Sequence, residues 1–347
     1  MKKTMRVAML YDVDDIRIES RAIPTLGDGE LLVQTRASGI CSGDIMGWYV
    51  RRKAPLVLGH EPSGTVAAIG GGDPPRDENG RAFEVGDRVA VHHHAPCFDC
   101  VACKRGDYVQ CPAWRGSAIE PGGLAEFFRV PRGNLAETRR LPEEMSFEDG
   151  SLVEPLGCVM KSIRRSGVRA GDTVLVIGLG VMGLMHVAIA LDLGARAIGT
   201  DFRPDRRAVA EELGATTVAP DDAPALARAT DGRGADVVIC GPGTPEALRN
   251  AIAAAAAGGT IVMFTPLEPG VLLSLDPNDI YFRDLHLIAS YSCGPDDTRA
   301  ALDTIARGVV TAKRLHATTF PLDQTPQAYK ALATAQIIKP IVTFDPS

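Results

Sequence analysis

The chain has 347 residues, more than one ordinary hydrophobic core contains, which suggests about two domains. Its 45% hydrophobic and 23% charged residues are typical of a globular protein. The formal net charge of -6 leaves no basic field to attract nucleic acid or an anionic membrane surface, so we expect neither as a partner.

The N-terminus does not resemble a targeting segment, because Arg6 and then acidic residues interrupt the apolar stretch that follows the first lysines. No run approaches the roughly 20 apolar residues of a membrane span. We therefore expect a cytoplasmic protein, whose thiols stay reduced. In that compartment clustered cysteines bind metal more often than they form disulfides.

The first 150 residues predict an all-β region with long loops. Short β-like runs lie between Gly, Pro and Asp turns, at residues 6–10, 30–37, 64–69, 88–92 and 125–130.

From about residue 152 strands alternate with helices. We expect strands at 172–178, 195–201, 235–240 and 258–265, and helices at 181–193, 205–213, 223–230 and 245–257. This alternation is typical of βαβ units with a parallel sheet covered on both faces. A β run at 285–292, helices near 296–308 and 325–335, and a last β run in "KPIVTF" complete the chain.

The stretch "VIGLGVMG" predicts a dinucleotide site, because its G-x-G-x-x-G pattern follows an apolar strand and opens a helix. Glycine permits a tight turn and close approach of the backbone, and the helix N-terminus offers free N–H groups to a pyrophosphate. The residues expected to contact the cofactor are Gly178, Gly180, Val181, Met182 and Gly183.

Asp201 ends the next strand and would accept hydrogen bonds from the adenosine ribose while repelling a 2′-phosphate, which favours NAD over NADP. Arg203, Arg206 and Arg207 follow it, and an arginine there could attract that phosphate; they could equally be surface charges on the next helix. Arg203 is included among the expected cofactor contacts.

Four cysteines in "CFDCVACKRGDYVQC" predict a structural zinc site. Cys97, Cys100, Cys103 and Cys111 are separated by two, two and seven residues, which suits tetrahedral Zn²⁺. Such a site has no open position for a substrate and serves to fix its loop. The main alternative is an iron–sulfur cluster, but the ferredoxin spacer before the last cysteine is about three residues.

A reactive metal would need other ligands. "GICSGD" offers Cys41, "LVLGHEPSG" offers His60 and Glu61, and "LVEPLGC" offers Glu154. A thiolate, an imidazole and carboxylates form a mixed shell that leaves room for a substrate oxygen. Spacing alone would not justify this grouping.

These motifs, in this order over nearly the whole chain, resemble the zinc-dependent medium-chain dehydrogenase/reductase family, in particular its sorbitol, threonine and polyol dehydrogenases. The resemblance implies an α/β protein. A GroES-like, β-rich catalytic domain would span 1–151, with the structural zinc lobe at about 95–113. A Rossmann NAD-binding domain would follow at 152–292, and residues 293–347 would return to the catalytic domain.

By the same resemblance, Cys41 and His60 are ligands of a catalytic zinc, Glu154 stands at a further ligand position, and Glu61 is the adjacent carboxylate, either a direct ligand or an outer one. The chain would thus hold two zinc ions and NAD, with NADP possible. One departure is Gly43 in Cys41-Ser42-Gly43-Asp44, where the family usually has the Ser or Thr that starts a proton relay. Water or a substrate hydroxyl would then carry the proton.

The resulting hypothesis is an oxidoreductase that interconverts a small secondary alcohol or polyol and its ketone, as a homodimer or homotetramer that pairs along the apolar strand at 285–292. The alternatives are an NADPH-linked carbonyl or enone reductase and a non-catalytic cofactor-binding protein of the same fold. The run His92-His93-His94 is interpreted as structural or surface-exposed, because alternation along a strand sends neighbours to opposite faces, with the alternative that one of the three lines the cleft.

Overall fold

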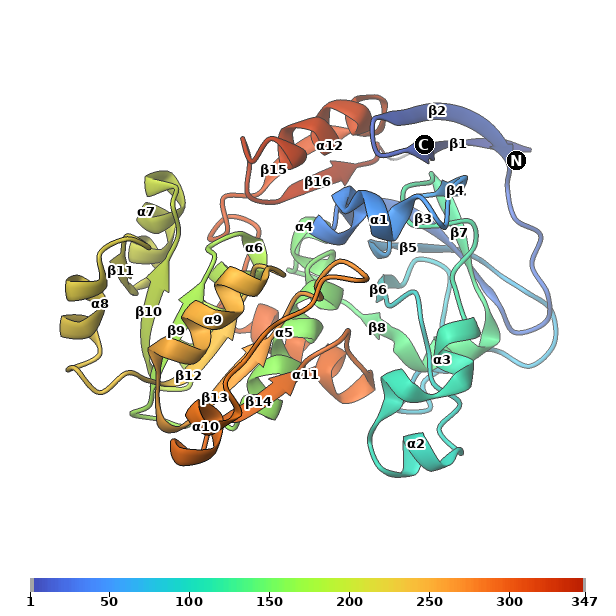
Figure 1. The fold of residues 1–347 in the computed structure, drawn as a ribbon. Helices are drawn as coiled ribbons and strands as arrows, with labels where there is room; N and C mark the ends of the chain where they lie inside the picture. Colours follow the sequence, from blue (N-terminus) through green and yellow to red (C-terminus); the bar gives the residue numbers. More distant parts are fainter. Residues whose placement is uncertain (1–2, 346–347) are drawn as a thin grey trace. The chain divides into compact units, whose positions relative to one another are not determined.

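The structure is a computed structural model that describes residues 3–345. It divides into two compact units (Figure 1). One comprises residues 3–157 and 293–345, and the other comprises Cys158–Ser292. The second unit begins at 158 rather than at 152 because the division falls inside helix α5 (Val153–Ser166). The first turn of this helix belongs to the first unit, where a Cβ on Gly157 would lie 3.1 Å from Cys293 Sγ.

The first unit is built on two β-sheets. A small sheet has the strand order β2-β1-β4, and a larger one has the order β15-β16-β3-β5-β6-β8, with β7 beside β3. The strand bounds are β1 Thr4–Asp12, β2 Asp15–Ala22, β3 Leu31–Gly39, β4 Leu56–Val57, β5 Glu61–Ile69, β6 Arg88–Val91, β7 Phe127–Val130, β8 Thr138–Arg140, β15 Thr318–Pro321 and β16 Pro340–Thr343.

The alternation of buried and partly exposed residues along the strands explains how the larger sheet packs. Leu31 and Val33 of β3 are fully buried, together with Val66 of β5 and Phe128 of β7, and they form one apolar cluster. The intervening residues of β3 are partly exposed. The C-terminal segment closes this sheet, because β16 pairs antiparallel with the end of β3.

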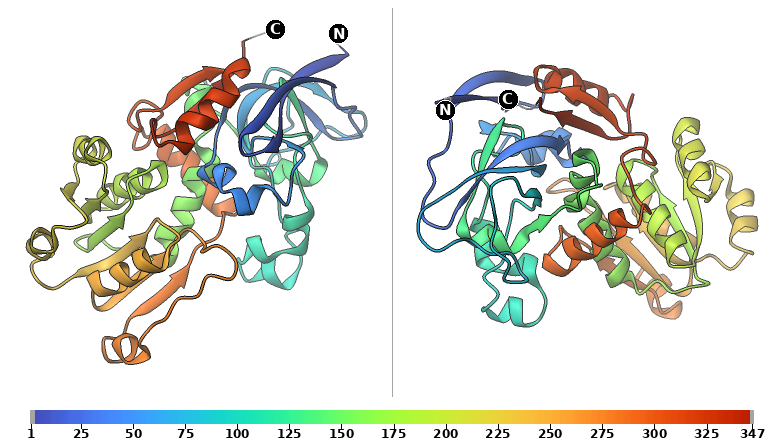
Figure 2. Two further views of the ribbon diagram at one scale, coloured as in Figure 1. Left: turned by 45° about the horizontal axis from the view of Figure 1, so that its top comes forward. Right: turned by 180° about the vertical axis from the view of Figure 1, so that it is seen from behind.

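Short helices lie between these strands. Their bounds are η1 Ser42–Ile45, α1 Gly47–Val50, α2 Val101–Lys104, η2 Tyr108–Gln110, α3 Pro112–Gly116, η3 Arg132–Glu137, α4 Phe147–Gly150, α11 Pro295–Ala306, η4 Leu322–Gln324 and α12 Thr325–Ala333. Both views in Figure 2 show α12 and β16 (red) beside the N-terminal strands (blue), and an ion pair between Arg6 and Asp323 links the two ends of the unit.

The second unit is a six-stranded sheet in the order β11-β10-β9-β12-β13-β14, in which every pair is parallel. This is the doubly wound arrangement that binds dinucleotides. The bounds are β9 Thr173–Ile177, α6 Val181–Asp192, β10 Arg196–Thr200, α7 Pro204–Leu213, β11 Thr216–Val218, α8 Ala223–Ala229, β12 Ala235–Cys240, α9 Pro245–Ala254, β13 Ala255–Met263, α10 Pro277–Phe282 and β14 His286–Ala289.

The helix predicted over 245–257 is too long. It ends at Ala254, and Ala255 already belongs to β13, where it lies opposite Ala235 of β12. Ala255 and Ala256 are buried in the sheet, so strand pairing and burial override the helix propensity of the alanine run. Among the described residues, no helix is long and apolar enough to cross a membrane.

Candidate metal and cofactor sites

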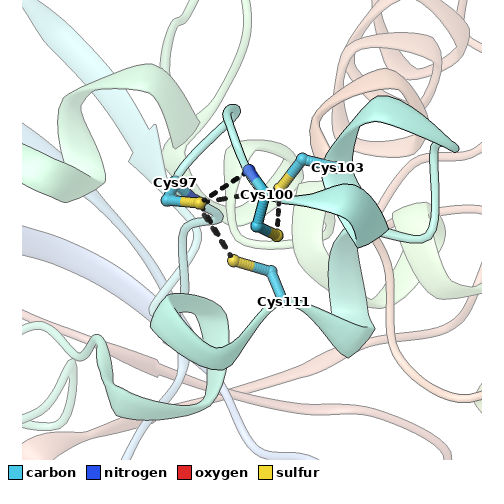
Figure 3. A group of neighbouring side chains, drawn as sticks. All are labelled: Cys97, Cys100, Cys103 and Cys111. Atoms are coloured by element: carbon cyan, nitrogen blue, oxygen red, sulfur yellow. Dashed lines mark hydrogen bonds between the residues drawn. The ribbon is translucent and has the colours of Figure 1, made fainter.

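The four clustered cysteines meet in one lobe of the first unit (Figure 3). The Sγ atoms of Cys100 and Cys103 are 3.5 Å apart, those of Cys97 and Cys111 are 3.5 Å apart, and those of Cys97 and Cys103 are 4.0 Å apart. No disulfide joins them. Four thiols at these separations match the corners of a tetrahedral Zn–S₄ site.

The backbone of the lobe favours thiolates. The N–H groups of Cys97 and Cys100 donate to the Sγ atoms of Cys111 and Cys97, at 3.3 and 3.4 Å. Burial alone would raise the pKa of Cys111, but hydrogen bonds from the N–H groups of Cys97 and Trp114 and from neighbouring thiols lower that pKa to about 6. A thiol with this pKa binds metal readily at neutral pH.

A second donor group lies elsewhere in the first unit, where one donor atom each from Cys41, His60 and Glu61 lies within 4.8 Å of the other two. Cys41 caps the short helix η1, and its Sγ accepts a hydrogen bond from the N–H of Gly43 at 3.3 Å. His60 and Glu61 stand at the start of β5. Cys41 is thereby brought beside two residues that are adjacent to each other in the chain.

Glu61 is held by a buried lysine. Its Oε2 accepts a short hydrogen bond from Nζ of Lys339, which also donates to the carbonyl of Ile40 at 3.1 Å. Both side chains of this ion pair are 1% exposed. Gly39 faces the pair across the β3–β5 register, and any Cβ there would overlap Glu61 Oε2, at 1.9 Å. The pairing therefore requires glycine at position 39.

The other oxygen of Glu61 fits a metal ligand. Oε1 is buried and has no hydrogen-bond partner within residues 3–345. Burial also raises the pKa of the Cys41 thiol and of Glu61, because it penalises their anionic forms. A cation between these groups would satisfy Oε1 and offset that penalty, so the donor set suits zinc.

His60 is oriented by an acidic neighbour. Its Nδ1 lies 3.7 Å from Asp44, whose other oxygen accepts a hydrogen bond from the hydroxyl of Tyr329 at 3.3 Å. Burial would lower the pKa of His60, but the charges of Asp44 and Cys41 outweigh it and raise that pKa well above its usual value. A carboxylate behind a histidine is the usual arrangement around a metal-bound imidazole.

Glu154 is grouped differently from the expectation. Its carboxylate lies within 4.8 Å of ring nitrogens of His92 and His93, and it is not part of the group formed by Cys41, His60 and Glu61. His92 Nε2 is 3.9 Å from Glu154 Oε1, and its Nδ1 is 3.5 Å from Glu137. Glu154 remains close enough to His60 to raise its pKa. It therefore lies between the predicted ligands and the histidine run.

The mutual packing of His92, His93 and His94 was not predicted from the sequence. The strand β6 ends at Val91, so alternation does not continue through the run, and the three rings pack on one another. The ring of His93 contacts that of His60, with centroids 5.0 Å apart. The cue in the sequence was the position of the run, just before the cysteine lobe.

Gly43 leaves space beside the donor group. A Cβ at this position would meet only Cys41 Sγ, at an ordinary contact distance of 3.5 Å. A serine would therefore fit, and its absence is not imposed by packing.

The glycine motif of the second unit forms the turn between β9 and α6. Gly178 has φ of 87°, in the left-handed region. A Cβ at Gly183 would lie 1.9 Å from the carbonyl oxygen of Gly178, so the helix can approach the strand only with glycine there. Val181 and Met182 form the first turn of α6, whose N-terminal cap is Gly180.

Asp201 follows β10 and is anchored to this turn. One carboxylate oxygen accepts from the N–H of Leu179 at 2.8 Å, and the other accepts from the N–H of Arg203 at 2.9 Å. The guanidinium of Arg203 is paired with Asp205. That of Arg206 lies 3.9 Å from Asp201 and is the nearest heavy-atom neighbour of a Cβ placed on Gly180. Among the three arginines, Arg206 is therefore the one beside the glycine turn.

Comparison with known proteins agrees with this geometry. Residues 27–142 match the model of the alcohol dehydrogenase GroES-like domain, and residues 181–307 match that of the zinc-binding dehydrogenase. A protein named "Probable D-xylulose reductase A" from Aspergillus clavatus is 30% identical over 96% of this chain and 95% of its own. The chain belongs to the zinc-dependent medium-chain dehydrogenase family. It is thus an oxidoreductase of this family, with the GroES-like and Rossmann folds expected from the sequence.

Other members of the family are equally similar. Sorbitol dehydrogenase from Bacillus subtilis is 30% identical over 94% of this chain and 93% of its own. A Sinorhizobium meliloti protein, provisionally assigned as a zinc-binding dehydrogenase and solved with NADP, has a TM-score of 0.87 and 30% identity, covering 99% of this chain and 100% of its own. The 2R,3R-butanediol dehydrogenase from Bacillus subtilis has a TM-score of 0.84 and 29% identity, covering 98% of this chain and 100% of its own.

Proposed function

We propose that the protein is a zinc-dependent, NAD(P)-linked dehydrogenase that interconverts a small secondary alcohol or polyol and its ketone. The observation that carries this proposal is the group formed by Cys41, His60 and Glu61, because a buried thiol, imidazole and carboxylate gathered from separate segments suit a reactive zinc. Two relatives named for sugar or polyol substrates, the xylulose reductase and sorbitol dehydrogenase, support the substrate class.

Two ions would be held by different residues. Cys41, His60 and Glu61 would hold the catalytic zinc, with Glu154 next to them as a further ligand. Cys97, Cys100, Cys103 and Cys111 would hold the structural one. The second set offers four sulfurs and no open position, so its role would be to fix the lobe.

The chain's own residues prepare the reaction. Lys339 fixes one oxygen of Glu61 and leaves the other for the metal, and Asp44 fixes the ring of His60. Zinc supplies a Lewis acid for the alcohol or carbonyl oxygen, and the nicotinamide supplies the hydride acceptor or donor. Since position 43 has no hydroxyl, the alcohol proton would leave through water or through another hydroxyl of the substrate.

We propose NAD as the preferred cofactor, because Asp201 presents a carboxylate where the adenosine ribose of a dinucleotide would bind. Gly178, Gly180, Val181, Met182 and Gly183 would cradle the pyrophosphate, with Arg203 nearby. Arg206, next to Asp201 and Gly180, is the side chain that would favour a 2′-phosphate. NADP would therefore bind more weakly than NAD but not be rejected completely.

A homodimer or homotetramer in the cytoplasm, acting on a free small-molecule substrate, remains our expectation. The reduced thiols that both zinc sites require support this location.

A panel of alcohols followed by absorbance of the reduced cofactor tests the proposal. Isopropanol, propylene glycol, xylitol and sorbitol would be supplied with NAD and, in parallel, with NADP. We expect alcohol-dependent reduction of NAD by protein that contains two zinc ions per chain. Zinc-replete protein that turns over none of these alcohols, nor reduces their ketones, would contradict the proposal and favour a non-catalytic binding protein.

A further inference from the structure

A further group of metal-binding side chains lies in the first unit, outside the set formed by Cys41, His60 and Glu61. One ligand atom each from His92, His93 and Glu154 lies within 4.8 Å of the other two. Nε2 of His92 is 3.9 Å from Oε1 of Glu154 and 3.8 Å from Sγ of Cys293. That Sγ also lies within 4.8 Å of a Glu154 oxygen. Two imidazoles, a carboxylate and a thiol are all ligands that zinc accepts.

His92 is oriented in the way that metal-binding histidines are. Its side chain is 1% exposed, and its Nδ1 lies 3.5 Å from Oε1 of Glu137. The other oxygen of Glu137 is fixed by Arg139 at 3.2 Å and by the hydroxyl of Thr298 at 2.7 Å. A carboxylate behind the ring is the usual partner of an imidazole whose other nitrogen binds a metal. Here that other nitrogen, Nε2, is the one near Glu154 and Cys293.

The buried charges around this group favour a cation. The side chains of Glu137 and Glu154 are 0% and 9% exposed. Arg139 pairs with Glu137 but also with Glu78, so one guanidinium serves two carboxylates and none of its charge is left for Glu154. A cation among the imidazoles would offset this excess of buried negative charge. In addition, Nδ1 of His93 is buried and has no hydrogen-bond partner within residues 3–345.

We propose that His92, His93, Glu154 and Cys293 form a third zinc site, weaker than the other two, whose occupation inhibits the enzyme. Nitrogen and sulfur ligands favour zinc over magnesium or calcium. The site is weaker because the rings of His93 and His60 are in contact, with centroids 5.0 Å apart, so its ion would be repelled by the catalytic zinc. Inhibition follows because the third ion competes for Glu154. This second part rests on the proposed function, whereas the binding of the ion does not.

The binding test uses protein dialysed until it retains two zinc ions per chain. Calorimetric titration with Zn²⁺ should then reveal one more site per chain, with a Kd in the micromolar range. His93→Phe and Cys293→Ala should each weaken it by at least about tenfold, the loss expected even for residues that only orient a ligand. His94→Phe is the matched control, because Nδ1 of His94 is already hydrogen bonded to the carbonyl of Ser117, and this variant should bind the ion like the wild type.

A spectrum identifies the thiol. Co²⁺ added to the two-zinc protein should produce the near-ultraviolet charge-transfer band of a cobalt–thiolate bond, while the zinc content stays at two. The band should be missing from Cys293→Ala and present in Cys240→Ala, in which another buried cysteine is replaced. A band that survives in Cys293→Ala would overturn the assignment of this ligand.

Turnover is followed during the same titration. Activity of the wild type should fall as the third site fills, with the same midpoint, and His93→Phe should resist this inhibition relative to its own starting rate. No additional ion in the wild type, or equal binding in His93→Phe and Cys293→Ala, would overturn the site. Loss of a tightly held zinc from His93→Phe would overturn it too, since the ring would then belong to the catalytic set. An ion that binds without slowing turnover would refute the inhibitory role. Two-zinc protein that is inactive before any zinc is added would instead contradict the proposed function, and the titration would still decide the site.

Discussion

A buried ion pair joins Lys339 and Glu61 in the first unit. A buried carboxylate is tolerated when a cation and hydrogen bonds accompany it, and here the lysine supplies both. The pair joins Glu61, the first residue of β5, to Lys339, the residue just before β16. A residue near the C-terminus thus orients a candidate metal ligand.

Replacing Lys339 with methionine should leave Glu61 as an uncompensated buried charge. We expect Lys339→Met to lower the free energy of unfolding by about 3 to 5 kcal/mol in the absence of zinc. Urea denaturation of the metal-free protein measures this loss. In the double variant with Glu61→Gln the charge is gone, so the loss should be markedly smaller. A Lys339→Met variant as stable as the wild type would show that the pair does not hold Glu61.

The ligand residues could be predicted from the sequence, but the residues that hold them in place could not. Cys41, His60 and Glu61 could be grouped only by the family resemblance, because eighteen residues (42–59) separate Cys41 from His60 along the chain. Lys339 had no signal at all, since a lysine before a C-terminal strand is ordinarily on the surface. The approach of His92 and His93 to Glu154 depends on where β6 ends, which composition does not specify.

At the scale of elements, helix α6 shows how the glycine turn is supported. His186 lies on its buried side, where Nδ1 is 2.7 Å from the carbonyl oxygen of Met182 and Nε2 is 2.9 Å from the hydroxyl of Ser162 in α5. Burial lowers the pKa of His186 to about 4. The histidine thus stays neutral and ties α6 to α5.

This lowered pKa predicts how the stability of the fold depends on pH. Between pH 6.5 and 4 the unfolded chain binds a proton at His186 that the folded chain does not, so stability falls as the pH is lowered through this window. At pH 5 the cost from His186 should be about 2 kcal/mol relative to pH 7.5. Urea unfolding at both pH values should show a smaller loss for His186→Gln than for the wild type. Equal losses in the two proteins would contradict the assignment.

The longer elements could be predicted and the short ones could not. The strands β9 and β12 and the helix α6 have strong apolar patterns and were expected within a few residues of their bounds. By contrast, β4, with two residues, and β11, with three, are defined only by the strands they pair with. The alanine-rich segment was ambiguous for the same reason. Pairing with β12, rather than intrinsic propensity, places Ala255 in a strand.

At the scale of the whole molecule, the sheet of the second unit leaves an edge at β14, which pairs with β13 on one side only among the described strands. The helix α10 just before it exposes Tyr281 and Phe282, which are 75% and 78% accessible. Large exposed aromatic side chains beside an open edge are typical of a surface that associates.

The proposed oligomer can be tested on this surface. Light scattering after size exclusion should give the mass of a dimer or a tetramer for the wild type. Replacing Tyr281 and Phe282 with glutamate should shift the mass toward the monomer at micromolar concentration, while the matched change Phe202→Glu, at another exposed aromatic residue, should not. A monomeric wild type would contradict the expectation.

Cys41, His60 and Glu61 are proposed to hold a reactive zinc, separate from the zinc of the four-cysteine lobe. Elemental analysis of the wild type, Cys41→Ser and Cys100→Ser, with NAD-linked turnover of the same samples, tests it most directly. We predict two zinc ions per chain in the wild type. Cys41→Ser should keep its fold and the lobe zinc but lose the other ion and at least a thousandfold in turnover, whereas Cys100→Ser should lose mainly the lobe zinc and stability. Full activity in protein that holds only the lobe zinc would rule out a reactive zinc at Cys41, His60 and Glu61.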